Sequence, residues 1–149
     1  VTYISEDVIS VVFEDHYYYG NIYEEYYDLR TRTINLEEGT VYEIKDIVNL
    51  DDEFMDAWYD SMQEEAPEIE VTDLLELDVF KRVFEGEFVE ERYADAFFLK
   101  DGGLEIGLSY HYDEDSSVSR GWMTAPFTWE EIASYKTDSS IWNIVESND

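Results

Sequence analysis

The pattern of apolar and polar positions divides the chain into strands at the amino terminus, helices in the middle and a hairpin near the carboxyl end. Apolar residues alternate with polar ones through residues 3–13, which predicts a strand. Similar patterns predict strands over residues 17–27, 31–36 and 40–44, with a turn at Glu38-Gly39 between the last two. Successive antiparallel strands of this kind favour a meander sheet.

Apolar residues at helical spacing predict two helices in the middle of the chain. The first helix can be capped by Asn49 or Asp51, whose side chains accept hydrogen bonds from the first turn. The second is expected to open at Thr72 or Asp73 and to stop at Gly86. The residues expected to face the core are Phe54, Met55, Trp58 and Met62 in the first helix and Leu74, Leu77, Phe80, Val83 and Phe84 in the second.

Residues 96–110 have the pattern of a β-hairpin with one buried face. A turn at 101–103 separates two strands, and the second strand carries apolar residues at alternate positions. A polar run then leads to a further strand within 121–127. Thr128 followed by Glu131 fits a capping box, so a helix is expected to begin after Thr128.

The chain is expected to form a single α+β domain over residues 1–149. In this fold an antiparallel meander sheet packs against two to three helices. A chain of 149 residues that is 44% hydrophobic is long enough to bury one core. The carboxy-terminal tail, 135–149, should dock as a short strand or helix through the apolar residues Ile141, Trp142, Ile144 and Val145.

The carboxy-terminal motifs resemble, in their order, those of the RsiV-like extracellular domain. This family of unknown function occurs in Gram-positive bacteria, in the ectodomain of a lysozyme-sensing anti-sigma factor and beside some cell-wall polysaccharide deacetylases. The matching residues are the hairpin from Phe97 to Ile106, then Tyr112, an acidic loop that closes on Gly121, and the pair Pro126-Phe127 before the capped helix. Weaker matches upstream, at 11–13, 17–20 and 33–48, extend the resemblance over residues 10–133.

The resemblance implies a non-catalytic binding or sensing domain outside the cell. Lysozyme recognition in the family is associated with surface loops, and the matching segments here are 17–21 and 112–121. Both segments depart from the family pattern, because its Gly-Gly-Ala-His loop is reduced to Tyr-Tyr-Tyr-Gly-Asn and its Ala-Pro-Tyr-Ala centre is replaced by residues 115–120. The candidate partner-binding residues are Tyr17, Tyr18, Tyr19, Asn21, Tyr112, Asp113, Glu114, Asp115 and Arg120.

Charge limits the kind of partner. Asp and Glu number 38 against 9 Lys and Arg, which gives a net charge of -29. Such a surface repels nucleic acid and anionic lipid and attracts cationic partners. This attraction weakens as the salt concentration rises. The charge therefore favours a cationic partner, and the resemblance to the RsiV-like domain implies that this is a cationic protein such as lysozyme, or a cell-wall component. We expect the protein to be extracellular or at the cell surface. It would associate with a membrane only through an anchor outside this sequence.

Candidate chemistry is sparse. Cysteine is absent, which excludes disulfides, thiolate nucleophiles and the usual zinc sites. The two histidines, His16 and His111, could meet in space, but each is more simply a surface histidine. The acidic runs 51–53 and 113–115 lack the alternating spacing of a calcium loop. We expect no catalytic residue, no metal and no cofactor.

Two other classes of function stay open. The charge alone suggests an acidic nucleic-acid mimic that inhibits a DNA-binding protein, and this hypothesis predicts carboxylates at phosphate-like intervals along an elongated surface. The resemblance also allows an accessory domain of a cell-wall enzyme. An enzymatic role would require loss of activity when His16 and His111 are substituted together.

Overall fold

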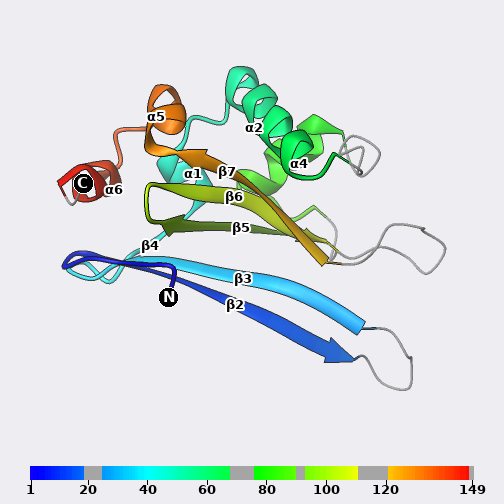
Figure 1. Ribbon diagram of the computed structural model, residues 1–149, viewed down its shortest axis with the longest axis horizontal. Coiled ribbons are helices and arrows are strands. Elements are labelled where there is room, and N and C mark those ends of the chain that lie inside the picture. The colour runs from blue at the N-terminus through cyan, green and yellow to red at the C-terminus, as the bar shows by residue number, and fades with distance from the viewer. Residues whose placement is uncertain (19–24, 68–75, 90–92, 111–120, 148–149) are drawn as a thin grey trace.

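The computed structural model describes residues 1–18, 25–67, 76–89, 93–110 and 121–147, which form two antiparallel sheets and a layer of helices (Figure 1). The fold is therefore α+β, as predicted. One sheet has the strand order β1-β2-β3-β4 and the other has the order β5-β6-β7. The strands are β1 (Tyr3–Ile4), β2 (Val8–Tyr18), β3 (Glu25–Asn35), β4 (Val41–Tyr42), β5 (Tyr93–Lys100), β6 (Gly103–Tyr110) and β7 (Gly121–Thr128).

The helices cover the face of the three-stranded sheet that is turned away from the four-stranded sheet (Figure 1). The molecule thus has three layers, with the three-stranded sheet in the middle. Among the described residues, no helix is long and apolar enough to cross a membrane. The helices are α1 (Ile44–Ile47), α2 (Asp52–Glu65), α4 (Leu77–Phe84), α5 (Trp129–Ile132), the 3-10 helix η1 (Ala133–Tyr135) and α6 (Ser140–Ser147).

The predicted strand boundaries in the amino-terminal sheet are wrong. A separate strand over 17–27 does not form, because β2 continues to Tyr18 and β3 begins at Glu25, in one register from Val8↔Asn35 to Tyr18↔Glu25. The charged residues at the middle of both strands suggested breaks. Asp15 and Arg30 lie on the outer face of the sheet, where they form an ion pair at 2.8 Å. Glu14 has the same parity as the buried Ser10, but its side chain is exposed.

The two faces of the four-stranded sheet differ in composition. Its inner face buries small hydroxyl and apolar side chains, and its outer face leaves Ile4, Phe13 and Val41 exposed. Across this outer face Ile4 pairs with Ile9, Ile34 pairs with Val41, and Phe13 pairs with Arg30. The outer face therefore mixes apolar side chains with arginine and with the aspartates of the pair Asp15↔Asp28.

The main core lies between the three-stranded sheet and the helices. Trp58 is fully buried, packs against Phe80 and Phe84 at ring distances of 4.9 and 5.1 Å, and donates its indole N–H to the carbonyl oxygen of Ile106 at 2.8 Å. The predicted inward residues of the first helix are all buried, and Leu104, Ile106, Leu108 and Tyr110 form a buried face of the hairpin, as the sequence indicated. The prediction of a single buried face is wrong, because Ser109 on the opposite face of β6 is also buried, against the four-stranded sheet.

The two sheets meet along a seam of hydroxyl groups. Thr31 and Ser10, on the inner face of the four-stranded sheet, accept hydrogen bonds from the backbone N–H groups of Phe97 and Leu99 at 3.1 and 3.0 Å. In return, Ser109 of β6 accepts from the N–H of Leu29 and donates to its carbonyl oxygen. The unpaired edges of β5 and β3 are thereby satisfied by side chains of the opposite sheet.

Helix ends follow the predicted caps at Asp51, Gly86 and Thr128 and differ from the prediction elsewhere. Asp51 accepts from the N–H of Phe54 at 2.9 Å, and Gly86 ends α4 at a φ of 80°. The predicted start of the second helix is wrong, because α4 begins at Leu77 and the backbone of Glu76 before it is extended. Residues 72 and 73 themselves lie outside the described residues. The predicted strand 40–44 is too long, because Glu43 and Asp46 form a capping box that starts α1.

The carboxy-terminal tail docks as predicted, and it does so as a helix. Ile141, Trp142 and Val145 of α6 are buried. The indole N–H of Trp142 donates to the carbonyl oxygen of Ile47 at 2.9 Å, which fixes α6 against α1.

Candidate functional site

A surface groove follows the outer edge of β7, between this strand and the last turns of α2. It consists of two adjoining cavities of about 370 and 280 Å³ that share Glu65, Lys100 and Pro126. We call it the β7-edge groove. Its walls come from α2 (Ser61, Met62, Glu64, Glu65), the residue after it (Ala66), the β5–β6 hairpin (Lys100, Asp101, Gly102, Glu105, Tyr110), β7 (Trp122, Met123, Thr124, Pro126, Phe127, Thr128) and α5 (Glu131).

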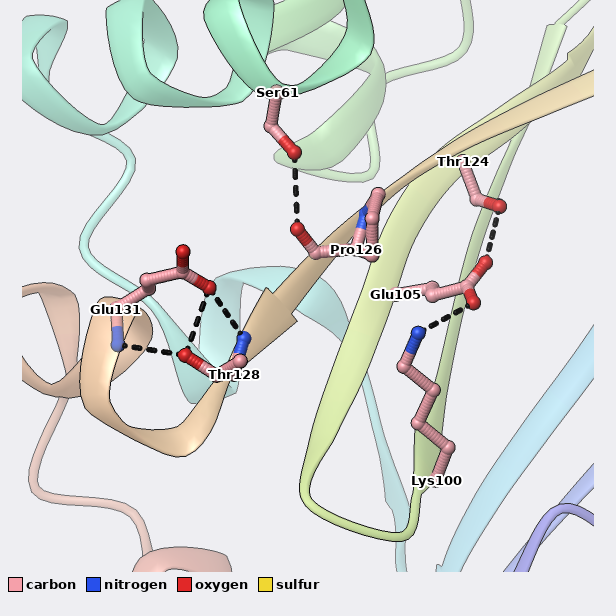
Figure 2. A network of polar contacts seen from close by, with 7 residues as sticks. All are labelled: Ser61, Lys100, Glu105, Thr124, Pro126, Thr128 and Glu131. Carbon is pink, nitrogen blue, oxygen red and sulfur yellow. Dashed lines mark hydrogen bonds and ion pairs between the residues drawn. The ribbon is translucent and has the colours of Figure 1, made fainter. Parts of the chain in front are cut away.

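A network of polar contacts fixes the floor of the groove (Figure 2). Glu105 of β6 accepts from the ammonium group of Lys100 at 2.8 Å and from the hydroxyl of Thr124 at 2.6 Å. Residues from all three strands of the sheet are thereby held together, because Lys100 belongs to β5 and Thr124 to β7. Charge-assisted hydrogen bonds of this length are the stronger kind, so these side chains are preorganised.

The carboxyl end of β7 is closed by local contacts, which Figure 2 also shows. Thr128 caps α5, with its hydroxyl accepting from the N–H of Glu131 at 3.2 Å, while the Glu131 carboxylate accepts from the N–H of Thr128 at 2.8 Å. The hydrogen bond from this backbone N–H, together with that from the Thr128 hydroxyl, lowers the pKa of Glu131. Ser61 of α2 donates to the carbonyl oxygen of Pro126 at 2.9 Å.

The groove combines an exposed aromatic surface with negative charge. Trp122, near the start of β7 at one end of the groove, is 39% exposed. Glu64, Glu65 and Asp101 are exposed on its rim and form no ion pair with any other described residue. Lys100 is the one basic residue among the described lining residues, and Glu105 already neutralises it. The groove therefore offers uncompensated carboxylates to a cationic ligand.

Comparison of this chain with protein-family models, with curated proteins and with solved structures found no match.

A second cavity, of about 390 Å³, lies between β3, β4, the end of α4 and the edge of β5. Asp95 and Glu43 line it, together with Arg32 and the aromatic residues Tyr42, Phe84 and Phe97. Glu43 forms an ion pair with Lys45 at 2.7 Å.

In this cavity the surroundings of Asp95 change the pKa of its carboxyl group. Although the residue as a whole is exposed along the strand edge, its carboxyl group lies against the cavity wall. Burial raises the pKa of Asp95, and the nearby carboxylate of Glu43 raises it further. Its own backbone N–H, Arg32 and Lys45 act in the opposite direction. Because both carboxylates already have cationic neighbours, this cavity has less free charge than the β7-edge groove.

Most of the residues predicted to bind a partner lie outside the described residues. These are Tyr19, Asn21, Tyr112, Asp113, Glu114, Asp115 and Arg120, while Tyr17 and Tyr18 belong to the end of β2 and their side chains are not described. The strand ends that flank both predicted segments, Tyr18 paired with Glu25 and Tyr110 paired with Gly121, lie at the same end of the molecule (Figure 1). The β7-edge groove begins beside the second of these ends.

Sequence reasoning missed the groove itself. Its residues come from α2, the hairpin and β7, which the chain brings together only in three dimensions. One signal was present, however, because a proline within a strand is confined to a sheet edge or a bulge. Pro126 in the predicted strand 121–127 therefore marked β7 as an edge strand.

The other candidate chemistry is absent from the described part of the chain or lies outside it. No group of three or more His, Asp or Glu residues within the described ranges is placed to hold a metal ion. The ring of His16 stacks on Tyr27 at 4.5 Å, and His111 lies outside the described residues.

Proposed function

We propose that this chain is a non-catalytic binding domain that recognises a cationic protein through the β7-edge groove. The observation that carries the proposal is that Glu65, which is exposed and forms no ion pair with a described residue, lines the same cavity as the exposed Trp122, while Glu64 and Asp101 line the adjoining cavity. Aromatic anchors surrounded by complementary charge are typical of protein-binding surfaces. The net charge of -29 adds long-range attraction for any basic partner.

The partner we propose is a basic protein met outside the cell, such as lysozyme, or a cationic cell-wall component. The resemblance to the RsiV-like domain supports this choice of partner and an extracellular or cell-surface location. The proposed groove adjoins Tyr110 and Gly121, the paired strand ends on either side of the predicted partner-binding residues between them, which themselves lie outside the described residues.

The nucleic-acid mimic and the accessory domain of a cell-wall enzyme remain alternatives with weaker support. A mimic needs carboxylates spread along the surface that meets a DNA-binding protein. The outer face of the four-stranded sheet instead carries Ile4, Phe13, Val41 and Arg30, so the acidic surface is interrupted there. The accessory domain rests on the resemblance alone.

Titration calorimetry against a c-type lysozyme tests the proposal, at low and at physiological salt, with a basic protein of unrelated shape as control. We expect binding to lysozyme that persists at physiological salt. Equal binding to both proteins that disappears with salt would reduce the charge to a nonspecific attractant and overturn the proposal.

Two charge-matched variants locate the binding surface. Each removes three negative charges, one set from the groove rim and the other from loops of the four-stranded sheet. We expect the groove variant to weaken binding by about tenfold and the control by about twofold or less, since only the former removes charges at the contact. The groove variant is E64Q/E65Q/D101N and the control is E6Q/E37Q/E38Q. Equal weakening by both would argue against the groove.

A further inference from the structure

The backbone of β7 turns every second residue toward the groove. In the antiparallel ladder of β6 and β7, residues alternate between bonding to the neighbouring strand and pointing away from it. The carbonyl oxygen of Pro126 points away, because Ser61 of α2 donates to it. Trp122, Thr124 and Thr128 have the same parity as Pro126, so their N–H and carbonyl groups also point outward.

At two of these four positions, Pro126 and Thr128, the outward backbone groups are unavailable to a further strand. Pro126 has no N–H to offer, and Ser61 occupies its carbonyl oxygen. The N–H of Thr128 donates to the carboxylate of Glu131. No described residue forms a hydrogen bond with the outward backbone groups of Trp122 and Thr124. Among the described residues, the outward backbone groups of the exposed Trp122 and of Thr124, which is 9% exposed, therefore have no hydrogen-bond partner.

The groove is shaped to receive a strand at this opening. Its wider cavity contains side chains from both faces of β7, Met123 on the helix side and Thr124 on the other, so it wraps around the strand edge. Met62 and Ala66 form its wall at the end of α2. An extended segment laid along the edge would have its side chains alternately against this wall and beside Trp122.

We propose that an extended basic segment of the partner binds by adding a strand to β7, with hydrogen bonds to the backbone of Trp122 and Thr124. The inference rests on the proposed function and specifies how the partner is bound. Main-chain hydrogen bonds to an open sheet edge supply affinity independent of sequence. Glu65 on the rim and the neighbouring Glu64 and Asp101 select lysine or arginine side chains in the added strand.

Amide hydrogen exchange tests strand addition directly. The probe is a blocked peptide of about eight residues in which lysine and valine alternate, a length typical of a short strand. Its control has the same composition, with every second residue in the D configuration, and cannot form a regular strand. We expect the L-peptide to slow exchange of the Trp122 and Thr124 amides at least tenfold and the control peptide to leave them unchanged.

A substitution within the edge gives a second measurement. Thr124→Pro removes the outward N–H of residue 124, and Pro126 shows that this edge accepts proline two residues further on. Thr124→Ala removes the same side chain and keeps the N–H. We expect the proline variant to bind the L-peptide about tenfold more weakly than the alanine variant, with each fold checked by circular dichroism.

The outcomes separate this inference from the proposed function. Equal binding of the L-peptide and its control, without protection of the two amides, would overturn strand addition and leave the cationic groove in place. Absence of any binding to lysozyme and to both peptides at low salt would overturn both. If Thr124→Pro does not fold, the exchange measurement on the unmodified protein still decides.

Discussion

The two outer edges of the three-stranded sheet, on β5 and on β7, differ in whether their outward backbone groups have hydrogen-bond partners. On β5, Thr31 and Ser10 of the other sheet accept hydrogen bonds from the outward N–H groups of Phe97 and Leu99. On β7, no described residue takes up the outward groups of Trp122 and Thr124. One edge is therefore hydrogen-bonded within the interior, whereas the other has no hydrogen-bond partner among the described residues at the exposed Trp122 and the largely buried Thr124.

This difference shows that the part of β7 without hydrogen-bond partners is kept short. An exposed strand edge invites pairing with other chains, and proteins shorten such edges with proline and local caps. Here Pro126 and the capping box at Thr128 close the second half of β7, so that within the described part of the chain Trp122 and Thr124 keep outward groups without a partner. An opening of this length suits a specific contact more than indiscriminate sheet extension.

The largest expected loss of stability comes from a substitution that forces β7 away from β6. A Cβ atom on Gly107 would overlap the carbonyl oxygen of Met123, so the two strands approach closely only because glycine is present. We expect Gly107→Ala to lower the free energy of unfolding by about 3 kcal/mol or more, through overpacking. Denaturant unfolding measures this change.

Gly121→Ala is the matched control on β7 itself. A Cβ atom there would have only the hydroxyl of Tyr110 nearby, at 3.9 Å. We expect its effect on the free energy of unfolding to be below about 1 kcal/mol. Similar losses in the two variants would mean that β6 and β7 are not held as closely as described.

Breaking the sealed edge is expected to have the next largest effect. Ser10 is fully buried, accepts from the N–H of Leu99 and shares a hydrogen bond of 2.8 Å with Thr33. Ser10→Ala leaves a buried N–H without an acceptor, which should lower the free energy of unfolding by about 2 kcal/mol. Thermal and denaturant unfolding measure it, with the exposed Ser134→Ala as control. A loss of unfolding free energy no larger than that of the control would contradict the proposed role of Ser10 in satisfying the β5 edge.

The sealed edge ends at Asp95, where stability should depend on pH. The raised pKa means that the folded protein binds this proton more tightly than the unfolded chain does. Stability is therefore lost as pH rises from the unfolded value, about 3.9, through the raised folded value. Asp95→Asn removes this loss, so it should gain stability over the unsubstituted protein across that window and match it at lower pH.

The control for this pH dependence is Asp60→Asn, which removes an equal charge from the exposed face of α2. It should show no comparable gain over the same pH range. Denaturant unfolding at a series of pH values measures both variants. A gain of equal size in the two would assign the effect to net charge rather than to the surroundings of Asp95.

The smallest effect is expected from lengthening the open edge. Pro126→Ala restores one outward N–H beside Thr124 and should change the free energy of unfolding by less than about 1 kcal/mol. We expect it to bind the alternating L-peptide about two- to threefold more tightly, because one more hydrogen bond becomes available. Equal gains for the L-peptide and its D-containing control would show that only the width of the groove had changed.

Much of the fold could be predicted because its signals are local. The helical spacing of Phe54, Trp58 and Met62, and the caps at Asp51 and Thr128, each lie within a few residues of the element they specify. The β5–β6 hairpin follows from alternation on both sides of one turn. Local rules failed where Glu43 starts a short helix instead of continuing a strand.

The division into two sheets could not be predicted, since it depends on distant partners. The positions of Ser10 and Thr31 look like ordinary polar positions in a strand, and only the fold shows that they face the edge of β5. The same holds for the groove, because Glu65 and Trp122 are far apart along the chain. Pro126 indicated an edge strand, but not that α2 would lie beside it.

The seam between the sheets also sets the order in which the chain can fold. Its hydrogen bonds join residues that are 66, 80 and 89 positions apart in the sequence. Closing loops of this length is entropically unfavourable, so such contacts form after local hairpins and helices. Until then the β5 edge is as open as that of β7, and neighbouring chains could pair through it. Mutual repulsion between chains that each carry a net charge of -29 opposes this pairing, so the acidic surface also protects the chain during folding.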